Sequence, residues 1–327
     1  MSFAKDKITG GEADSGQIII GISFMQKNNL SSPYILTADI GGSHITVGIC
    51  DLVTRVILPQ SIVRMDVFSK GPAKDILSSW EHAFLEVLKM NPGLLISGLS
   101  VAMPGPFDYK NGISRIRGFN KYEALYDMDI RGYFARFLNL EPHLIRFRND
   151  AESTIAGEVL MGAGQGPQRV LGVTLGTGFG SAYGGKTIIK NINLGSNPFK
   201  ESIADNYLST RWFLKRYRDL TGISLSDGVK ELSELAPKSV VVRAVFKEFA
   251  VNMIDVLSAP VEQLNPQALV ICGNIAKASE HFLPYVIQHF DFLSIKLAQL
   301  DENAPLIGAA ALFDENFGQV GTLPKCG

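Results

Sequence analysis

The stretch Tyr34–Asp51, YILTADIGGSHITVGICD, decides the fold. Its first five residues are apolar or β-favouring, which predicts a short buried strand that ends at Asp39. Gly41 and Gly42 follow, and the apolar run Ile45–Cys50 predicts a second strand. We therefore predict a strand–turn–strand unit with one carboxylate and two glycines at its bend.

This bend has the chemistry of a phosphate site. Glycine lets the backbone adopt positive φ and approach a ligand closely, and successive amides at such a bend favour anions. A neighbouring carboxylate repels phosphate unless a cation lies between them, so Asp39 is expected to face Mg²⁺ through water. The alternative is an ordinary hairpin with a glycine turn, which this stretch alone leaves open.

Length and composition limit the class of protein. The chain has 327 residues, of which 46% are hydrophobic and 19% charged, which is typical of a globular protein with two domains. The net charge of −1 gives no overall attraction to nucleic acid or to an anionic membrane, so neither is expected as a partner. No apolar run reaches the ~18 residues that a membrane span needs.

The cysteines and the N-terminal segment give two further expectations. Cys50, Cys272 and Cys326 are far apart, which indicates core thiols in a reducing cytoplasm and no disulfide or zinc framework. Residues 1–33 are expected to form a loose N-terminal extension, and Met25 is a candidate for the true start.

A second glycine-rich unit lies near the middle of the chain. Residues 170–186, VLGVTLGTGFGSAYGGK, predict a strand that runs into glycines and a second strand that returns from them. A duplicated architecture places the two units face to face across a cleft, where they would hold one polyphosphate from both sides. Neither glycine loop opens a helix, so dinucleotide binding of the GxGxxG type fits poorly. The loop residues are Gly176, Thr177, Gly178 and Gly180.

A polar pair, Asn149-Asp150, joins a predicted strand (143–148) to a helix that extends through Met161. Either residue is a good helix N-cap, which is the structural interpretation. The functional interpretation is that an Asp at the end of a strand accepts a proton from a substrate hydroxyl, while the adjacent Asn binds another hydroxyl. The dipeptide alone does not decide between them.

The remaining elements alternate between helix and strand. Residues 97–107 predict a strand ending in a Pro-Gly-Pro turn, and residues 268–274 predict a strand ending in Gly-Asn. A surface loop is expected over 111–127, and the small residues at 308–310 suit close helix packing. The basic and aromatic mixture at 205–220 indicates an amphipathic helix with a solvated face, although such a mixture also occurs in RNA-binding helices. Helices are predicted over 74–90, 129–138, 205–220, 239–258 and 275–290.

Taken in order, these motifs resemble the ROK family of bacterial sugar kinases and sugar-responsive repressors, within the actin-like, hexokinase-type ATPase fold. The resemblance covers about residues 34–315. It implies an α/β protein with two RNase H-like domains around a central cleft, spanning 34–148 and 149–302, with a C-terminal helix (about 303–320) that returns to the first. The motifs are DIGGS (39–43), VAMPGP (101–106), ND (149–150), TLGTGFG (174–180), CGN (272–274) and GAA (308–310).

The resemblance also implies an activity, namely ATP-dependent phosphorylation of a hexose as in glucokinases, with Mg²⁺. Asp150 would be the general base, and Asn149 and Asn120 would hold sugar hydroxyls. Asp39 would organise Mg²⁺, the two glycine loops would bind the phosphates, and Gly273 would lie beside the adenosine. The implied nucleotide-binding residues are Asp39, Gly41, Gly42, Ser43, Gly176, Thr177, Gly178, Gly180, Gly273 and Asn274.

The sequence departs from the family pattern at the sugar site. The family usually has Glu-x-Gly-His after the second phosphate loop, where this chain has Asn193-Leu194-Gly195-Ser196. The family's cysteine-rich zinc loop is missing, because no cysteine lies between positions 51 and 271, so no structural zinc is expected. Asp205 falls where the family has a sugar-binding Glu, so Asp205 and Asn193 are expected in a rebuilt sugar pocket.

Three alternatives follow from these departures and from the family's range. The first is a kinase for another sugar, such as N-acetylmannosamine or fructose, in place of glucose. The second is a sugar-responsive regulator of transcription, and the third is a non-catalytic sugar binder. Family members are often dimers, so a homodimer is expected by resemblance alone.

Overall fold

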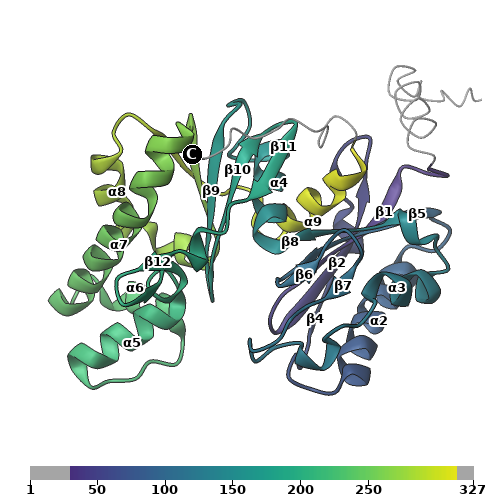
Figure 1. The fold of residues 1–327 in the computed structure, drawn as a ribbon, viewed down its shortest axis with the longest axis horizontal. Helices are drawn as coiled ribbons and strands as arrows, with labels where there is room; N and C mark the ends of the chain where they lie inside the picture. Colours follow the sequence, from purple (N-terminus) through teal and green to yellow (C-terminus); the bar gives the residue numbers. More distant parts are fainter. Residues whose placement is uncertain (1–29, 315–327) are drawn as a thin grey trace, which may run out of the picture.

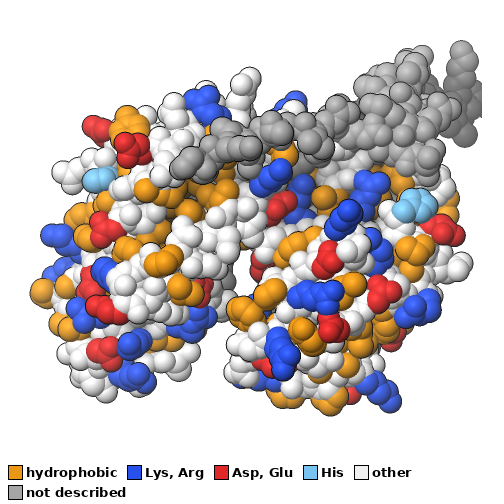
Figure 2. Space-filling model, viewed as in Figure 1, with side chains coloured by type: hydrophobic (Ala, Val, Ile, Leu, Met, Phe, Trp, Pro, Cys, Tyr) orange, Lys and Arg blue, Asp and Glu red, His pale blue; other side chains and the backbone are white. Residues whose placement is uncertain are grey.

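The computed structural model describes residues 30–314, so Met25, Cys326 and nearly all of the expected N-terminal extension lie outside the described residues. The described chain forms two lobes, each built on one β-sheet, and the helices α4 (Asp150–Met161) and α9 (Asn303–Ala310) lie where the lobes meet (Figure 1). The space-filling view shows an open cleft between the lobes below this junction (Figure 2).

The first sheet contains the predicted strand–turn–strand unit. β1 (Tyr34–Ile40) pairs antiparallel with β2 (His44–Asp51) and parallel with β5 (Ile96–Met103), and β5 pairs parallel with β8 (Ile145–Asn149). The strand order is β3-β2-β1-β5-β8, with β4 also paired to β2. Smaller strands in this lobe are β3 (Val56–Ile57), β4 (Val63–Asp66), β6 (Phe107–Asp108) and β7 (Ile113–Ser114).

The alternation of side chains along β1 explains where Asp39 points. Leu36, Ala38 and Ile40 belong to the core that this sheet shares with α2 (Ala73–Met90) and α3 (Ile130–Leu138). Ile35 packs on the opposite side, in the cluster that contains α9. Because neighbouring residues of a strand point to opposite faces, Asp39 shares the α9 face of the sheet.

The second sheet repeats the plan of the first. β9 (Val170–Leu175) pairs antiparallel with β10 (Phe179–Gly185) and parallel with β14 (Ala268–Cys272), as β1 does with β2 and β5. Helices pack on its outer face around Phe213, Phe246 and Phe249. These helices are α5 (Thr210–Thr221), α6 (Gly228–Leu235), α7 (Val240–Leu264) and α8 (Leu283–His289), and the other strands are β11 (Ile188–Asn191), β15 (Ser294–Leu297) and the hairpin β12 (Pro198–Phe199) with β13 (Ser202–Ile203).

The helices α4 and α9 cross at very short distance, as the small residues at 308–310 predicted. A Cβ atom on Gly308 would lie 1.7 Å from the Ser153 carbonyl oxygen, and one on Gly157 would lie 2.1 Å from the Ala304 carbonyl oxygen. The buried carboxylate of Glu158 accepts backbone N–H groups on both sides of the crossing, from Ala163, Gln299 and Leu300. These contacts join the two lobes.

Several predicted segments differ from the structure. The C-terminal helix predicted over about 303–320 ends at Ala310 and is followed by a 3-10 turn (311–313), and the helix predicted over 239–258 extends to Leu264. The helix predicted over 205–220 begins at Thr210, because residues 204–206 form one 3-10 turn whose Asp205 carboxylate bonds to another segment. The helix predicted over 275–290 divides into a 3-10 segment (274–281) and α8, which restarts with Pro284 in its first turn, a favoured place for proline. The loop over 111–127 contains β7 and a 3-10 turn (123–125).

None of the helices between residues 30 and 314 is both long and apolar enough to cross a membrane.

We predict that Gly308→Ala lowers the free energy of unfolding by about 1–3 kcal/mol or more, because backbone atoms of α4 occupy the place of the new methyl group. Gly176→Ala is the control, since a methyl group there meets no atom within 4 Å. Chemical denaturation of both variants measures the difference. Equal loss of stability in the two variants would contradict the close crossing.

Candidate active site

The first glycine loop lies between β1 and β2, and side chains from distant segments hold its carbonyl groups. The Gly41 carbonyl oxygen accepts a hydrogen bond from the Tyr122 hydroxyl at 2.5 Å, and the Gly42 carbonyl oxygen accepts one from Ser69 Oγ at 2.5 Å. In a trans peptide the C=O and the next N–H point in opposite directions. The N–H groups of Gly42 and Ser43 therefore face away from these anchors, and neither has a hydrogen-bond partner within residues 30–314.

The second glycine loop, between β9 and β10, is held in the same way by the start of α5. The Gly176 carbonyl oxygen accepts from the Thr210 N–H at 2.8 Å and from Thr210 Oγ1 at 3.0 Å. The Thr177 carbonyl oxygen accepts from the Arg211 guanidinium at 2.7 Å. The N–H groups of Thr177 and Gly178 are turned the other way, and the described part of the chain offers them no partner.

Each loop thus presents two adjacent backbone N–H groups that bond to no described residue. An unpaired N–H group is a strong donor, and adjacent groups of this kind form a site for an anion. Both loops are partly exposed, and each follows the central strand of its sheet. The geometry suits one polyanion bound by both loops.

Asp39, at the end of β1, lies deep between the lobes, with part of its surface still open. Burial, together with the negative charge of Asp150, raises its pKa from 3.8 to about 7, against the opposing effect of Arg64. Arg64 is on β4 and pairs with Glu302, before α9, at 2.5 Å. The register Asp39–Thr46–Arg64 across β1, β2 and β4 explains why the guanidinium shares a face with the carboxylate.

Asp150 is the first residue of α4 and is half-buried. Its Oδ1 accepts hydrogen bonds from the Ala151 N–H at 2.8 Å and from Asn149 Nδ2 at 2.9 Å, whereas Oδ2 has no partner among the described residues. Gly180 of the second loop packs directly against this helix start, since a Cβ on it would lie 2.4 Å from Ala151 Cβ. Asp150 therefore lies beside the second loop and within electrostatic range of Asp39 at the first.

The capping interpretation of Asn149 is confirmed, because its side-chain oxygen accepts a hydrogen bond from the Glu152 N–H at 3.1 Å. Its Nδ2 also donates to the Tyr109 hydroxyl at 3.2 Å, and Tyr109 in turn donates to the Met103 carbonyl oxygen at 3.1 Å. Burial raises the pKa of Tyr109 above its usual value. The Asn149 side chain thus both caps α4 and orients the Asp150 carboxylate.

The segment 193–196 lies against the second glycine loop. The Leu194 N–H donates to Ser181 Oγ at 2.9 Å, and a Cβ on Gly195 would lie 2.4 Å from the Phe179 carbonyl oxygen. Asn193 is exposed, has a left-handed backbone (φ 50°), and accepts a hydrogen bond from Ser196 Oγ at 3.1 Å. No hydrogen bond links Asn193 directly to Asp150 among the described residues.

Asn120 lies near the first glycine loop. It is exposed, and its N–H donates to Glu123 at 2.9 Å. The next residue, Lys121, extends along the loop, since its Cδ would lie 3.8 Å from a Cβ on Gly42. The residues that follow Asn120 thus contact the predicted phosphate loop, whereas the role of Asn120 in sugar binding stays a prediction.

The other predicted residues gather at the second loop. Gly273, directly after β14, has a φ of 92°. A Cβ atom on it would lie 2.3 Å from the carbonyl oxygen of Leu175, the last residue of β9. Asn274 begins the 3-10 segment that follows. Asp205 is not free: Oδ1 accepts from the Phe179 N–H at 2.6 Å and Oδ2 from Arg211 at 2.5 Å. Its expected role in sugar binding stays a prediction.

Several residues that shape the site were not predicted from the sequence. Tyr109, Tyr122, Ser69 and Arg211 hold either the loops or the Asn149-Asp150 pair. None lies in a recognisable motif, although Tyr109 follows the Pro-Gly-Pro turn and Tyr122 follows Asn120.

A structural metal site is not evident among residues 30–314, where no three His, Cys, Asp or Glu side chains converge. The site nevertheless suits a divalent cation bound mainly by water and phosphate oxygens, as Mg²⁺ usually is. The Asp39 side chain makes no hydrogen bond with the described chain, and burial together with the negative charge of Asp150 raises its pKa; a bound cation would offset that charge. Its role toward Mg²⁺ stays a prediction.

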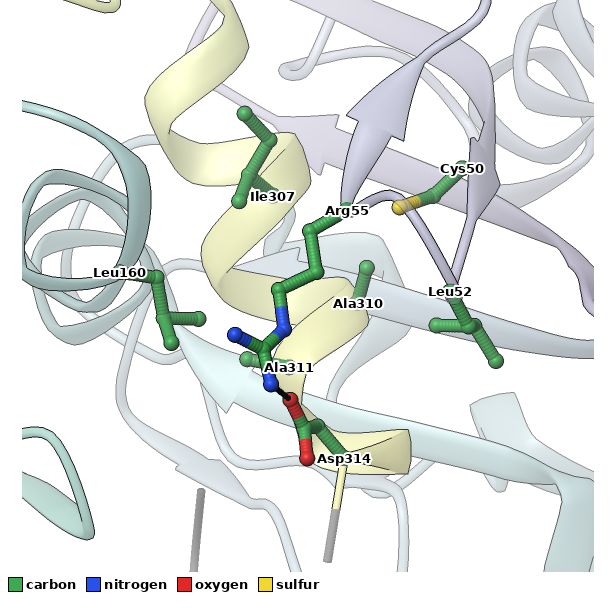
Figure 3. Close-up of a pocket in the computed structure, with 8 residues that line it drawn as sticks. All are labelled: Cys50, Leu52, Arg55, Leu160, Ile307, Ala310, Ala311 and Asp314. Carbon is green, nitrogen blue, oxygen red and sulfur yellow. Dashed lines mark ion pairs between the residues drawn. The ribbon is translucent and has the colours of Figure 1, made fainter. Parts of the chain in front are cut away.

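A separate small pocket lies at the opposite end of β2 from the glycine loop (Figure 3). It is mostly apolar and contains the ion pair between Arg55 and Asp314, whose atoms are 2.5 Å apart. Its other lining residues are Cys50, Leu52, Leu160, Ile307, Ala310 and Ala311. None of the predicted site residues lines it.

Solved structures define the class of protein. A ROK family glucokinase from Streptomyces griseus, in complex with glucose and AMPPNP, has a TM-score of 0.69 at 20% sequence identity, covering 85% of this chain and 98% of that chain. A ROK family transcriptional regulator, a homologue of the E. coli MLC protein, has a TM-score of 0.72 at 14% identity, covering 86% and 78%. The protein is a two-domain α/β protein of the actin-like ATPase fold, as predicted.

Sequence comparison identifies the family. The ROK family model matches residues 35–197. The glucokinase of Thermotoga maritima is 21% identical over 322 residues, which is 87% of this chain and 98% of that protein. The family match and the similarity to a glucokinase confirm the resemblance to the ROK family seen in the sequence.

We predict that Asp39→Asn makes the protein more stable than the wild type at about pH 8 and that this difference shrinks toward about pH 5. The wild-type Asp39 takes up a proton more readily when folded than when unfolded, so its ionisation reduces stability as the pH rises from 3.8 to about 7. Thermal unfolding in EDTA measures the effect, with the exposed Asp75→Asn as control. A difference in stability between Asp39→Asn and the wild type that does not change with pH would contradict the raised pKa of Asp39.

Proposed function

We propose that this protein is an ATP-dependent sugar kinase that phosphorylates a hexose, as glucokinases do. One observation carries the proposal: Asp150 lies between two loops that each present unpaired backbone N–H groups, beside Gly180 of one and within electrostatic range of Asp39 at the other. Phosphoryl transfer depends chiefly on positioning and on stabilisation of phosphate charge, which this arrangement suits.

The nucleotide's phosphates would lie between the loops. The N–H groups of Gly42, Ser43, Thr177 and Gly178 would hydrogen-bond phosphate oxygens. Mg²⁺, when bound, would offset the negative charge of the phosphates, and Asp39 would orient its water ligands. The strand end at Gly273 and Asn274 would lie beside the adenosine, as the resemblance implies.

Asp150 would act as the general base. Asn149 and the Ala151 N–H fix its Oδ1, so the carboxylate is oriented before substrate binds. Its Oδ2 has no partner in the described chain and would accept the proton of the sugar hydroxyl. The hydroxyl oxygen would attack the terminal phosphate of ATP, and ADP would leave. Asn149, Asn120 and Asn193 would bind other hydroxyls of the sugar.

The identity of the sugar depends on the segment 193–196. It lies against the second loop, where the chain presents the exposed polar side chains of Asn193 and Ser196. These are neutral and short, in contrast to the Glu and His of the family motif. Glucose is therefore one candidate beside fructose and N-acetylmannosamine.

The proposal is tested by ATP turnover with glucose, mannose, fructose, N-acetylglucosamine and N-acetylmannosamine, each with and without Mg²⁺. We expect Mg²⁺-dependent release of ADP with one of these sugars. Sugar binding without turnover would instead favour a sugar-responsive regulator, a function that the fold of the transcriptional regulator keeps open. A DNA mobility-shift assay of the same preparation would then test that alternative.

We predict that Asp150→Asn lowers kcat by ~10²–10⁴, the usual contribution of a positioned base. The amide can still accept the Ala151 N–H through its oxygen, so we expect the fold and ADP affinity to be kept. Asp75→Asn is the matched control because Asp75 is exposed and also lies in the first turn of a helix, α2. Turnover near the wild-type value in Asp150→Asn would refute the assignment of the base.

A further inference from the structure

The first two residues of α5 hydrogen-bond to two consecutive carbonyl groups of the second glycine loop. The N–H and Oγ1 of Thr210 bind the Gly176 carbonyl oxygen, and the Arg211 guanidinium binds the Thr177 carbonyl oxygen. The orientation of these two peptide groups decides where the N–H groups of Thr177 and Gly178 point. Residues of α5 therefore control the two donors that the loop offers to an anion.

Asp205 completes this arrangement from the other side of the loop. Its Oδ2 binds the Arg211 guanidinium at 2.5 Å, and its Oδ1 binds the Phe179 N–H at 2.6 Å. A Cβ on Gly178 would lie 2.9 Å from Oδ1, so the carboxylate is in close contact with the loop backbone. Both carboxylate oxygens are therefore engaged within the protein.

We propose that Asp205 and Arg211 are positioning residues that set the conformation of the second glycine loop and thereby the affinity for the nucleotide. This inference rests on the proposed function, but it gives Asp205 a different role from the sugar-binding role that the resemblance implies. A sugar hydroxyl could reach this carboxylate only by sharing an oxygen that already holds the loop or Arg211.

The chemistry of the pair supports this role. Guanidinium has a planar set of donors, so Arg211 binds the Thr177 carbonyl and the Asp205 carboxylate at once through different nitrogens. The side chain of Arg211 is 60% exposed, whereas that of Asp205 is 26% exposed. The guanidinium also adds positive charge beside the loop, which favours a phosphate there.

The experiment compares Asp205→Asn, Arg211→Gln and the double variant with Arg216→Gln. Arg216 is the matched control because it lies on the same helix and pairs with Glu248 at 2.8 Å, away from the loop. Calorimetry measures the Kd for ADP with Mg²⁺, and steady-state kinetics measure KM for ATP and for the sugar separately. Thermal unfolding of each variant establishes that it is folded.

We expect Asp205→Asn and Arg211→Gln each to raise the Kd for ADP and the KM for ATP roughly tenfold, as loss of a charge-assisted hydrogen bond does. The KM for the sugar and the behaviour of Arg216→Gln should stay within about twofold of wild type. The double variant should be little worse than either single one, because the two residues act as a unit. Arg211→Lys, which keeps the charge, should be intermediate and serves as the test if Arg211→Gln fails to fold.

The outcomes separate this inference from the proposed function. A raised KM for the sugar with unchanged ADP affinity in Asp205→Asn would make Asp205 a sugar ligand and overturn the inference. Wild-type ADP affinity in a folded Arg211→Gln or Arg211→Lys would overturn it as well. If the wild type binds ADP, phosphorylates no sugar and loses ADP affinity in both variants, the inference holds and the proposed function fails. If the wild type does not bind ADP, both fail.

Discussion

The close crossing of α4 and α9 is the constraint on which the rest of the site depends. A side chain on Gly157 or Gly308 would collide with backbone atoms of the other helix, so only glycine permits this approach. α4 begins at Asp150, and the buried Arg148 just before it donates to the Gly308 carbonyl oxygen at 2.8 Å. The contacts between α4 and α9 that join the lobes therefore also fix the position of Asp150, the proposed base, between the two loops.

The two glycine loops reach the same geometry through different chemistry. In each loop two consecutive carbonyl groups are anchored from outside, by Tyr122 and Ser69 in one and by Thr210 and Arg211 in the other. Because a peptide group is rigid, fixing its oxygen also fixes its N–H on the opposite side. Glycine permits these loops, but the anchors determine which way the amides point. The anion site is thus a property of the surrounding segments as much as of the glycine-rich sequence.

This division explains how much the sequence alone could predict. Both strand–turn–strand units and the close packing at Gly308 were predicted correctly, and the cap at Asn149 is one of the two interpretations that the sequence left open, because each depends on a local pattern of residues. The anchors were not predicted, because Ser69 and Tyr122 are separated from their partners by 27 and 81 residues and lie in no motif. The start of α5 was misplaced for the same reason: Asp205 has helix-compatible neighbours, but its carboxylate bonds to Phe179. Local pattern thus located the loops, and only the folded chain revealed what holds them.

The position of Asp205 depends on the short segment that precedes α5. This segment contains the short hairpin β12–β13, whose Phe199 ring packs edge-on against Tyr207 with centroids 5.2 Å apart. Lys200, at the hairpin turn, lies 5.4 Å from the Tyr207 ring and donates to Asn252 at 2.6 Å. These contacts fix both ends of the segment that carries Asp205 and hold it against the second glycine loop. A carboxylate held there binds the Phe179 N–H and the Arg211 guanidinium, so the short hairpin and its packing determine which groups of the protein Asp205 contacts.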